Sequence, residues 1–368
     1  MNPIDFNRTR APSLTARVAL DLAYGRPRSA SPAFRPENVR RILVIRRNGI
    51  GDMICTLPLL RSLAEARPDL ALDVLAGEKN ALLLEGLPFI RKVHVYRRGR
   101  GLMRNHYLNL RRVLAPIRAE NYDLVIAVKA GFSPLLAVIA RATRAPWRLG
   151  YVPSKGHPLG FCFNLQVELP VEREHQMDSC LRFLDPLGIS VRSRDLSFLL
   201  PPEARRWAEA AETSHGLAGR PWALVHVSSE RHESRWTPVG MASLAAALKS
   251  SLGFEVLLCG LPSDAAAMAM TAKLAGAAVV GRETPPSIRH FAALAARARF
   301  LVCSDGGQMH VGAAMRTPVF ALFSTADPRI WRAREVPFSY IQRGHYVADL
   351  APAEVAAQVV AWAKNLPP

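Results

Sequence analysis

Two short turns that combine glycine with an acidic residue, each set between an apolar strand pattern and a helix pattern, most constrain this chain of 368 residues. The first lies in Arg41–Asp52, with the sequence RILVIRRNGIGD, and the second in Phe300–His310, with the sequence FLVCSDGGQMH. In open α/β sheets, ligands collect outside the carboxyl ends of the strands, where helix N-termini direct N–H groups into a crevice. One such turn in each half predicts two α/β domains that face a shared cleft.

Apolar runs alternate with helical patterns along both halves of the chain, which indicates parallel sheets covered on both faces. In the first half we expect strands at 41–46, 71–76, 93–96 and 123–128 and helices at 52–66, 105–119, 132–143 and 174–187. In the second half we expect strands at 222–227, 254–259, 299–303 and 318–323 and helices at 237–251, 263–275, 308–315 and 352–364. The stretch before the last helix has no obvious strand.

A break at Leu199–Pro202, where two prolines follow two leucines, marks the expected connection between the domains. The chain is long enough for each domain to bury its own core. The expected parts are a basic, loosely ordered arm over 1–40 with a short helix at Leu14–Ala23, domains over 41–200 and 201–345, and a segment over 346–368 whose helix packs back toward the first domain.

The composition is that of a globular, cytosolic protein. No apolar stretch approaches the roughly 20 residues that span a bilayer, and the N-terminus lacks the apolar core of a secretory signal. The five cysteines are odd in number and scattered, so they predict neither a disulfide framework nor a zinc site. We therefore expect a cytoplasmic protein with no bound metal.

The net charge of +18, from 48 Lys and Arg against 30 Asp and Glu, favours an anionic partner. One basic segment contains Arg97, Arg98, Arg100, Arg104, His106, Arg111 and Arg112 without an intervening acid, and a second group is Arg141, Arg144, Arg148 and Lys155. The first segment lacks the interleaved aromatic residues of a single-strand binder, so nucleic acid is disfavoured. An acidic acceptor at an anionic membrane face and a merely solvated surface both remain open for it.

The residues of the first turn suit a catalytic base. Gly49 and Gly51 allow a sharp turn with space for a ligand, and Asp52 follows at a helix N-terminus, which favours its ionised form. Asp52 is therefore either a general base or only a helix cap.

The residues of the second turn suit a diphosphate. Successive N–H groups at Gly306 and Gly307 would receive its oxygens, although the spacing matches neither a Walker motif nor Gly-x-Gly-x-x-Gly. His310 is either a ligand or structural. Arg235 either binds phosphate or stacks on Trp236.

Two long motifs resemble the lipopolysaccharide heptosyltransferase family, glycosyltransferase family 9. Ile42–Leu63 is similar to the family's opening segment, and Cys303–Pro328 is similar to its C-terminal signature. Between them Tyr122–Val128, Trp147–Tyr151, Ser228–Trp236 and Leu257–Asp264 follow the family's order. The resemblance covers about residues 41–345.

This resemblance implies a GT-B fold of two Rossmann-like domains facing a central cleft. It implies an inverting enzyme without metal or cofactor that moves a heptose from an ADP-activated nucleotide sugar to an acidic lipopolysaccharide-core glycolipid at the inner membrane surface. Asp52 corresponds to the catalytic base. The expected donor-binding residues are Ser228, Arg235, Asp264, Asp305, Gly306, Gly307 and His310. The expected acceptor-binding residues are Asn48, Gly51, Arg98, Arg100, Arg104 and Lys129.

Several departures from the family pattern bear on donor and acceptor choice. Ser234 stands where the family commonly has a phosphate-contacting lysine, which Arg231 or Arg235 could replace, and Gly306 stands for a threonine or serine. Lys129 lies where the family has an Asp-Leu-Gln-like segment, and the arm has no counterpart. A GT-B enzyme with another donor, such as a UDP-sugar, and a non-catalytic relative that binds nucleotide sugar remain alternatives.

Overall fold

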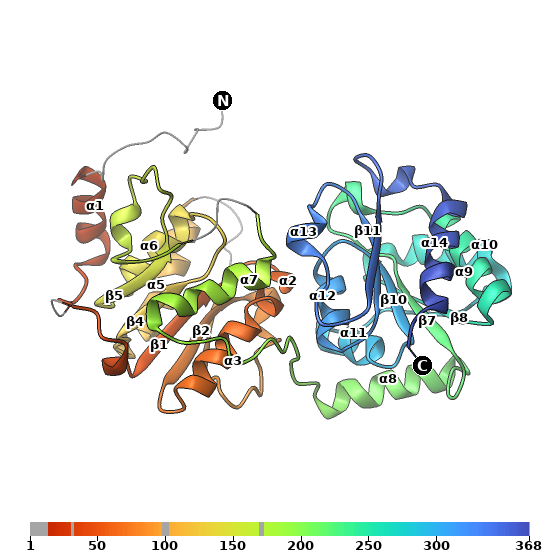
Figure 1. The fold of residues 1–368 in the computed structure, drawn as a ribbon, viewed down its shortest axis with the longest axis horizontal. Coiled ribbons are helices and arrows are strands. Elements are labelled where there is room, and N and C mark those ends of the chain that lie inside the picture. Colours follow the sequence, from red (N-terminus) through yellow and green to blue (C-terminus); the bar gives the residue numbers. More distant parts are fainter. Residues whose placement is uncertain (1–13, 31–32, 98–102, 169–172, 368) are drawn as a thin grey trace. The chain divides into compact units, whose positions relative to one another are not determined.

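A computed structural model describes residues 14–30, 33–97, 103–168 and 173–367, which form two α/β units divided between Asp195 and Leu196 (Figure 1). This division lies close to the sequence break at Leu199–Pro202. Each unit contains one parallel six-stranded sheet with helices packed on it. The predicted α/β architecture of two Rossmann-like domains is confirmed.

The sheet of the first unit has the order β3-β2-β1-β4-β5-β6. Its strands are β1 Arg41–Arg46, β2 Ala71–Gly77, β3 Lys92–Tyr96, β4 Leu124–Ala127, β5 Trp147–Tyr151 and β6 Leu165–Val167. The central strand β1 pairs in parallel with β2 on one side and β4 on the other. Its apolar run is buried from Ile42 onward because helices cover both faces of the sheet.

The helices of the first unit are α1 Leu14–Tyr24, α2 Ile50–Ile54, α3 Leu57–Ala66, α4 Glu78–Ala81, α5 Met103–Ala119, α6 Pro134–Ala142 and α7 Gln176–Leu181. The single helix expected at 52–66 is thus divided into α2 and α3. Pro58 explains the division, because proline lacks an N–H and clashes with the carbonyl four residues earlier, so it is accepted in the first turn of α3.

The sheet of the second unit has the order β12-β11-β10-β7-β8-β9. Its strands are β7 Trp222–His226, β8 Glu255–Cys259, β9 Val279–Glu283, β10 Phe300–Ser304, β11 Val319–Phe323 and β12 Phe338–Gln342. Its helices are α8 Pro202–Ser214, α9 Pro238–Leu252, α10 Ala265–Ala275, α11 Ile288–Ala295, α12 Gly307–Ala314, α13 Pro328–Trp331 and α14 Pro352–Lys364. The stretch before α14, in which no strand was expected, contains the edge strand β12.

The last helix, α14, belongs to the core of the second unit. Val355 and Val359 are buried there against α9, and Trp362 contacts the ring of Phe300 edge to face at 5.6 Å between centroids. The structure therefore uses the apolar face of α14 within the second unit. The expected packing of this helix toward the first domain stays a prediction.

The segment 14–40 is fixed to the first unit at several points, which corrects the expectation of a loosely ordered arm for this part of the chain. Leu20 and Tyr24 of α1 pack against the core, and Asp21 forms an ion pair with Arg141. The Tyr24 carbonyl accepts hydrogen bonds from Arg118 at 2.8 Å and Arg144 at 2.9 Å. The helix expected at Leu14–Ala23 is confirmed. Residues 1–13 lie outside the described part.

Candidate active site

The candidate site of the first unit is the turn between β1 and α2, where Asp52 faces partly into solvent. Its carboxylate is 24% exposed, and Oδ1 lies 2.8 Å from Nη2 of Arg46, whose side chain is fully buried. Nη1 of Arg46 donates a hydrogen bond to the Val128 carbonyl at 2.8 Å. A Cβ atom at Gly49 would lie 3.2 Å from Oδ2 of Asp52, so the glycine leaves space beside this oxygen. Arg46 thus holds Oδ1 of the carboxylate, while part of the Asp52 side chain stays exposed.

A second element, α4, fixes the backbone of the same turn. The amide group of Asn80, which is buried, donates hydrogen bonds to the carbonyls of Arg46 and Asn48 and accepts one from the Gly77 N–H. A Cβ atom at Gly77 would lie 2.5 Å from the Arg47 carbonyl oxygen, so only glycine permits this approach. Asn80 and Gly77 are therefore positioning residues for the Asp52 turn.

The structure brings part of the predicted acceptor site together at one sheet edge. Strands β1 and β4 are parallel neighbours with Ile45 opposite Ala127, so the turn after β1 and Lys129 after β4 lie at the same edge. Asn48 and Lys129 are half-buried there, and Gly51 is buried in α2. These residues remain predicted acceptor contacts.

Of the predicted acceptor residues Arg98, Arg100 and Arg104, the structure describes only Arg104. Arg98 and Arg100 lie outside the described residues, and Arg104 belongs to helix α5. Their role therefore remains a prediction.

The second basic group contributes to the structure of the first unit. Arg148 is buried and donates hydrogen bonds to the carbonyls of Cys162 and Ala145, each at 2.7 Å. Burial lowers the pKa of Arg148 to about 10. Arg141 pairs with Asp21, and Arg144 binds a carbonyl of α1. Part of the positive charge is therefore used within the fold.

The candidate site of the second unit is the turn between β10 and α12. Asp305 is buried at the end of β10, and its Oδ2 forms an ion pair with Arg231. Among the described residues, Oδ1 of Asp305 has no hydrogen-bond partner although it is buried. Gly306 and Gly307 follow and open α12, whose first N–H groups lack partners within the helix. The turn therefore combines a cation, a carboxylate oxygen and N–H donors.

Two neighbouring strands end beside this turn. Strand β7 lies between β10 and β8, and Oγ of Ser228 accepts a hydrogen bond from the Leu261 N–H at 2.7 Å. Asp264 is buried at the start of α10. The exposed side chain of Arg235 donates to the Ser229 carbonyl at 3.0 Å. The predicted donor residues thus gather at the carboxyl ends of β7, β8 and β10.

Ser234 and His310 are buried side chains next to this edge. Oγ of Ser234 lies 2.7 Å from Oγ of Ser324, and its carbonyl accepts a hydrogen bond from Ser304. A lysine at this position would bury its charge among hydroxyl groups. Arg231 and Arg235 remain predicted as the cations that replace it. His310 contacts the ring of Trp331 edge to face, 6.1 Å between centroids.

Sequence reasoning missed Arg46 and Asn80 and gave Arg231 only as a substitute. An arginine at the end of an otherwise apolar strand, six residues before an acid, is the one local signal for Arg46. No local signal links Asn80 to the Asp52 turn, because Arg46 and Asn48, whose carbonyls it binds, lie more than 30 residues away in the chain.

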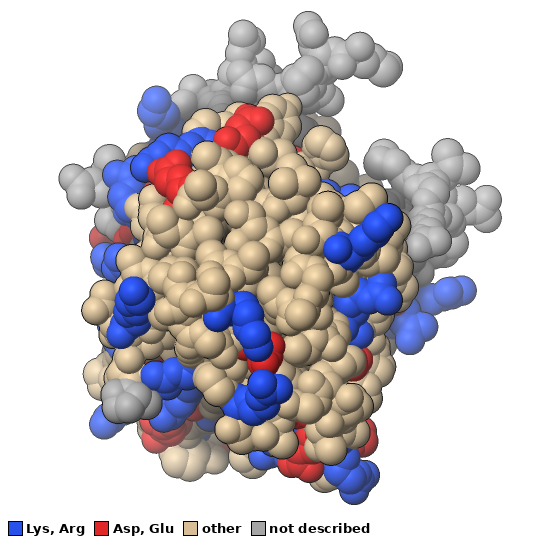
Figure 2. Space-filling model, turned by 90° about the vertical axis from the view of Figure 1, so that its right-hand side faces the viewer, with Lys and Arg blue, Asp and Glu red and all other residues tan. Residues whose placement is uncertain are grey.

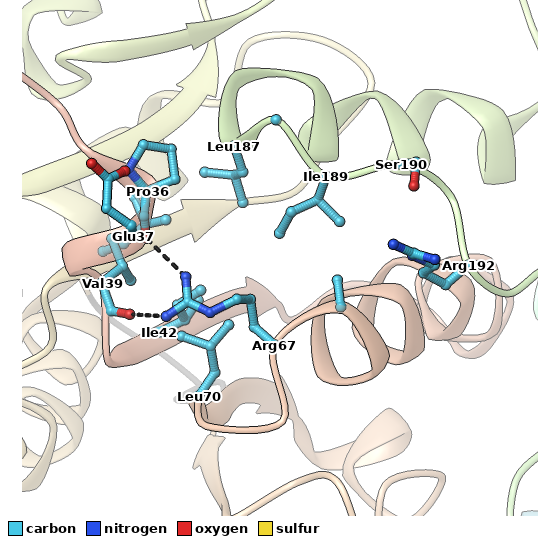
Figure 3. A pocket seen from close by; sticks show the side chains of 13 residues that line it. Pro36, Glu37, Val39, Ile42, Arg67, Leu70, Leu187, Ile189, Ser190 and Arg192 are labelled. Carbon is cyan, nitrogen blue, oxygen red and sulfur yellow. Dashed lines mark hydrogen bonds between the residues drawn. The ribbon is translucent and has the colours of Figure 1, made fainter.

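A cavity of about 420 Å³ in the first unit lies at the amino ends of the central strands, opposite the ends that carry Asp52 and Lys129 (Figure 3). It is lined by Ile42 at the start of β1 and Leu124 at the start of β4. The guanidinium group of Arg67 lies in it and donates hydrogen bonds to the carbonyls of Pro36 and Val39, each at 3.0 Å. Because ligands of such sheets bind at the carboxyl ends of the strands, this cavity is not the candidate active site.

Other kinds of site receive little support in the part of the chain that the structure describes. Here no group of three or more His, Cys, Asp or Glu could hold a metal ion, and no helix is long and apolar enough to cross a bilayer. All five cysteines are buried and none forms a disulfide, and burial raises the pKa of Cys162 to about 11, so its thiol stays protonated. On the side of the second unit seen in Figure 2, Lys and Arg are scattered among uncharged areas and form no continuous basic stripe of the kind a nucleic-acid binder presents.

Comparison with known proteins points to one family. The sequence model described as "Glycosyltransferase family 9 (heptosyltransferase)" matches residues 110–346. Lipopolysaccharide heptosyltransferase 3 of Escherichia coli is 23% identical over 291 residues, which cover 77% of this chain and 83% of that protein.

Solved structures agree in fold. A family 9 glycosyltransferase from Veillonella parvula is 22% identical with a TM-score of 0.74, covering 89% of this chain and 90% of that one. The E. coli ADP-heptose lipopolysaccharide heptosyltransferase II is 21% identical with a TM-score of 0.68, covering 88% and 98%. The E. coli heptosyltransferase WaaC, solved with ADP, is 19% identical with a TM-score of 0.67, covering 88% and 99%.

Proposed function

The chain belongs to glycosyltransferase family 9, and from this premise we propose that it moves a heptose from an ADP-activated donor to an acidic acceptor of the lipopolysaccharide core. The matched relatives include lipopolysaccharide heptosyltransferases of E. coli, one of them solved with ADP. The observation that carries the proposal is Asp52, whose Oδ1 is held by Arg46 and whose side chain is 24% exposed.

In the proposed reaction an acceptor hydroxyl attacks the anomeric carbon of the donor sugar. The new bond joins this carbon to the acceptor oxygen, and the bond to the diphosphate breaks on the opposite face, which inverts the configuration. Oδ2 of Asp52 takes the hydroxyl proton while Arg46 holds Oδ1. The nucleoside diphosphate leaves with the bonding electron pair.

In this proposal the candidate site of the second unit stabilises the negative charge that grows on the diphosphate. Arg231 and Arg235 supply guanidinium groups, and the turn at Gly306 and Gly307 supplies N–H donors at the start of α12. These groups occupy the role that a divalent metal has in other sugar transferases, so we propose a metal-independent reaction. The buried Oδ1 of Asp305 is suited to accept a hydrogen bond from a hydroxyl of the donor sugar.

The acceptor assigned to the first unit is a membrane glycolipid bearing carboxylates or phosphates. Asn48, Gly51 and Lys129 lie at the edge that holds Asp52, and Lys129 supplies a positive charge there. Because a lipopolysaccharide-core acceptor is a membrane glycolipid, we propose that the enzyme works in the cytoplasm at the inner membrane surface.

A panel of nucleotide sugars, scored by release of nucleoside diphosphate with a lipopolysaccharide-core acceptor, tests the proposal. We expect turnover with ADP-heptose that requires the acceptor, withstands chelation of divalent metals and yields the inverted linkage. Turnover with a UDP-sugar alone would establish the alternative donor. Nucleotide-sugar binding without turnover across the panel would establish a binding-only relative and contradict the proposed reaction.

A further inference from the structure

Helix α1 exposes an apolar stripe to solvent. Leu14, Val18 and Leu22 recur every four residues and therefore lie on one face, and they are 75%, 51% and 83% exposed. Large apolar side chains gathered in this way mark an interaction surface more often than isolated ones do.

This stripe is a fixed feature of the fold, because the other face of α1 is bound to the first unit. Leu20 and Tyr24 pack against the core, and Asp21 pairs with Arg141 of α6. Figure 1 shows α1 beside α6 at the margin of the first unit. The exposed stripe therefore does not arise from a helix detached from the protein.

A cationic cavity of about 530 Å³ adjoins the stripe and shares Leu14 and Val18 with it. The charged side chains that line the cavity are Arg17, Arg26, Arg28, Arg141, Arg148 and Asp21. Arg141 and Arg148 are more than nine-tenths buried, and within the described residues Nε of Arg141 has no hydrogen-bond partner. One aspartate cannot neutralise five guanidinium groups, so the cavity is suited to an anion.

We infer that α1 and the adjoining arginine cavity form a docking surface for an anionic phospholipid bilayer. The apolar stripe would enter the boundary between headgroups and acyl chains, and the arginines would bind headgroup phosphates beside it. Surfaces that bind anionic bilayers have the same arrangement, with apolar side chains that enter the bilayer and basic side chains beside them at the headgroups. The inference does not depend on the sugar that is transferred, because it concerns lipid binding by a surface outside the candidate active site.

Co-sedimentation of the full chain with vesicles tests this inference. We expect binding to phosphatidylglycerol-containing vesicles and far weaker binding to pure phosphatidylcholine. The triple variant Leu14→Gln, Val18→Gln and Leu22→Gln should lower the partition coefficient roughly tenfold or more. The matched control is Val239→Gln, Met270→Gln and Leu274→Gln, which changes three apolar residues of the second unit that are each half exposed or more, and it should leave partitioning unchanged.

The charge contribution is tested separately. Arg17→Gln with Arg26→Gln should weaken binding to anionic vesicles severalfold and reduce its salt dependence. Arg206→Gln with Arg282→Gln, exposed arginines of the second unit, should not.

Three results would overturn the inference: equal binding to neutral vesicles, undiminished binding by the folded stripe variant, or a stripe variant that changes only the oligomeric state. Melting curves identify variants that fail to fold. In that event Leu22→Gln alone, at the most exposed position of the stripe, takes the place of the triple variant.

Discussion

At the scale of single residues, the pair of Arg46 and Asp52 determines the geometry of the proposed base. Arg46 is fully buried, and its charge is compensated by the carboxylate and by the Val128 carbonyl. A buried guanidinium group needs such partners, and its planar fork reaches both at once. The arginine thus holds Oδ1 of Asp52, and we propose that Oδ2 receives the proton.

We expect Arg46→Lys to retain the charge but to lose this double contact, because an ammonium group cannot reproduce the fork. The turnover number should fall about 10- to 100-fold by analogy with other supporting residues, and the free energy of unfolding should fall by about 2–4 kcal/mol. Steady-state kinetics and chemical denaturation measure the two effects. An unchanged turnover number in the folded variant would show that Arg46 has no positioning role.

His226 at the end of β7 predicts a pH dependence of stability. Burial lowers its pKa to about 4, against an ordinary value of 6.5. Between these values the unfolded chain binds a proton that the folded protein does not, so stability falls as the pH falls from 6.5 to 4. The shift corresponds to about 3 kcal/mol at the lower end. Denaturation of His226→Gln across this range should show a shallower loss than the wild type, and parallel curves would contradict the assignment.

At the scale of elements, close packing at the start of α9 supports the proposed donor site. A Cβ atom at Gly240 in α9 would overlap the indole of Trp236, which is buried at the entrance to this helix. Trp236 lies next to Arg235, so this packing also anchors the arginine proposed to face the diphosphate.

Gly240→Ala therefore should destabilise the protein by about 1–3 kcal/mol, although alanine ordinarily favours a helix interior over glycine by about 1 kcal/mol. Thermal or chemical denaturation provides the measurement. Ser250→Ala, at an exposed position of the same helix, is the control and should change stability by less than about 0.5 kcal/mol. A stabilised Gly240→Ala protein would show that the indole moves aside without cost.

The strands that form the centre of each sheet were predictable because their apolar runs are nearly continuous, as in Arg41–Arg46. The edge strand Phe338–Gln342 was missed because its partly exposed residues leave no continuous apolar run. Local patterns likewise predicted the two turns with Asp52 and Asp305. They did not identify Asn80 or the anchoring of Tyr24, because those contacts join residues distant in the chain.

At the scale of the whole molecule, the charge of +18 has more than one use. Buried arginines such as Arg148 support the first unit, whereas Arg231 and Arg235 belong to the proposed donor site. The arginines beside α1 form the proposed lipid-binding surface. Net charge alone therefore could not separate these uses, and the placement of individual side chains was required.

The central claim, that this chain transfers a sugar with Asp52 as the base, is tested most directly by Asp52→Asn. The amide keeps the shape of the side chain but cannot take the hydroxyl proton. With ADP-heptose and a core acceptor, the account predicts that single-turnover release of ADP falls by roughly 100-fold or more. The donor dissociation constant, measured by calorimetry on the same protein, should stay within about twofold of the wild type. Near-normal turnover in the folded variant would contradict the account and reduce Asp52 to a helix cap.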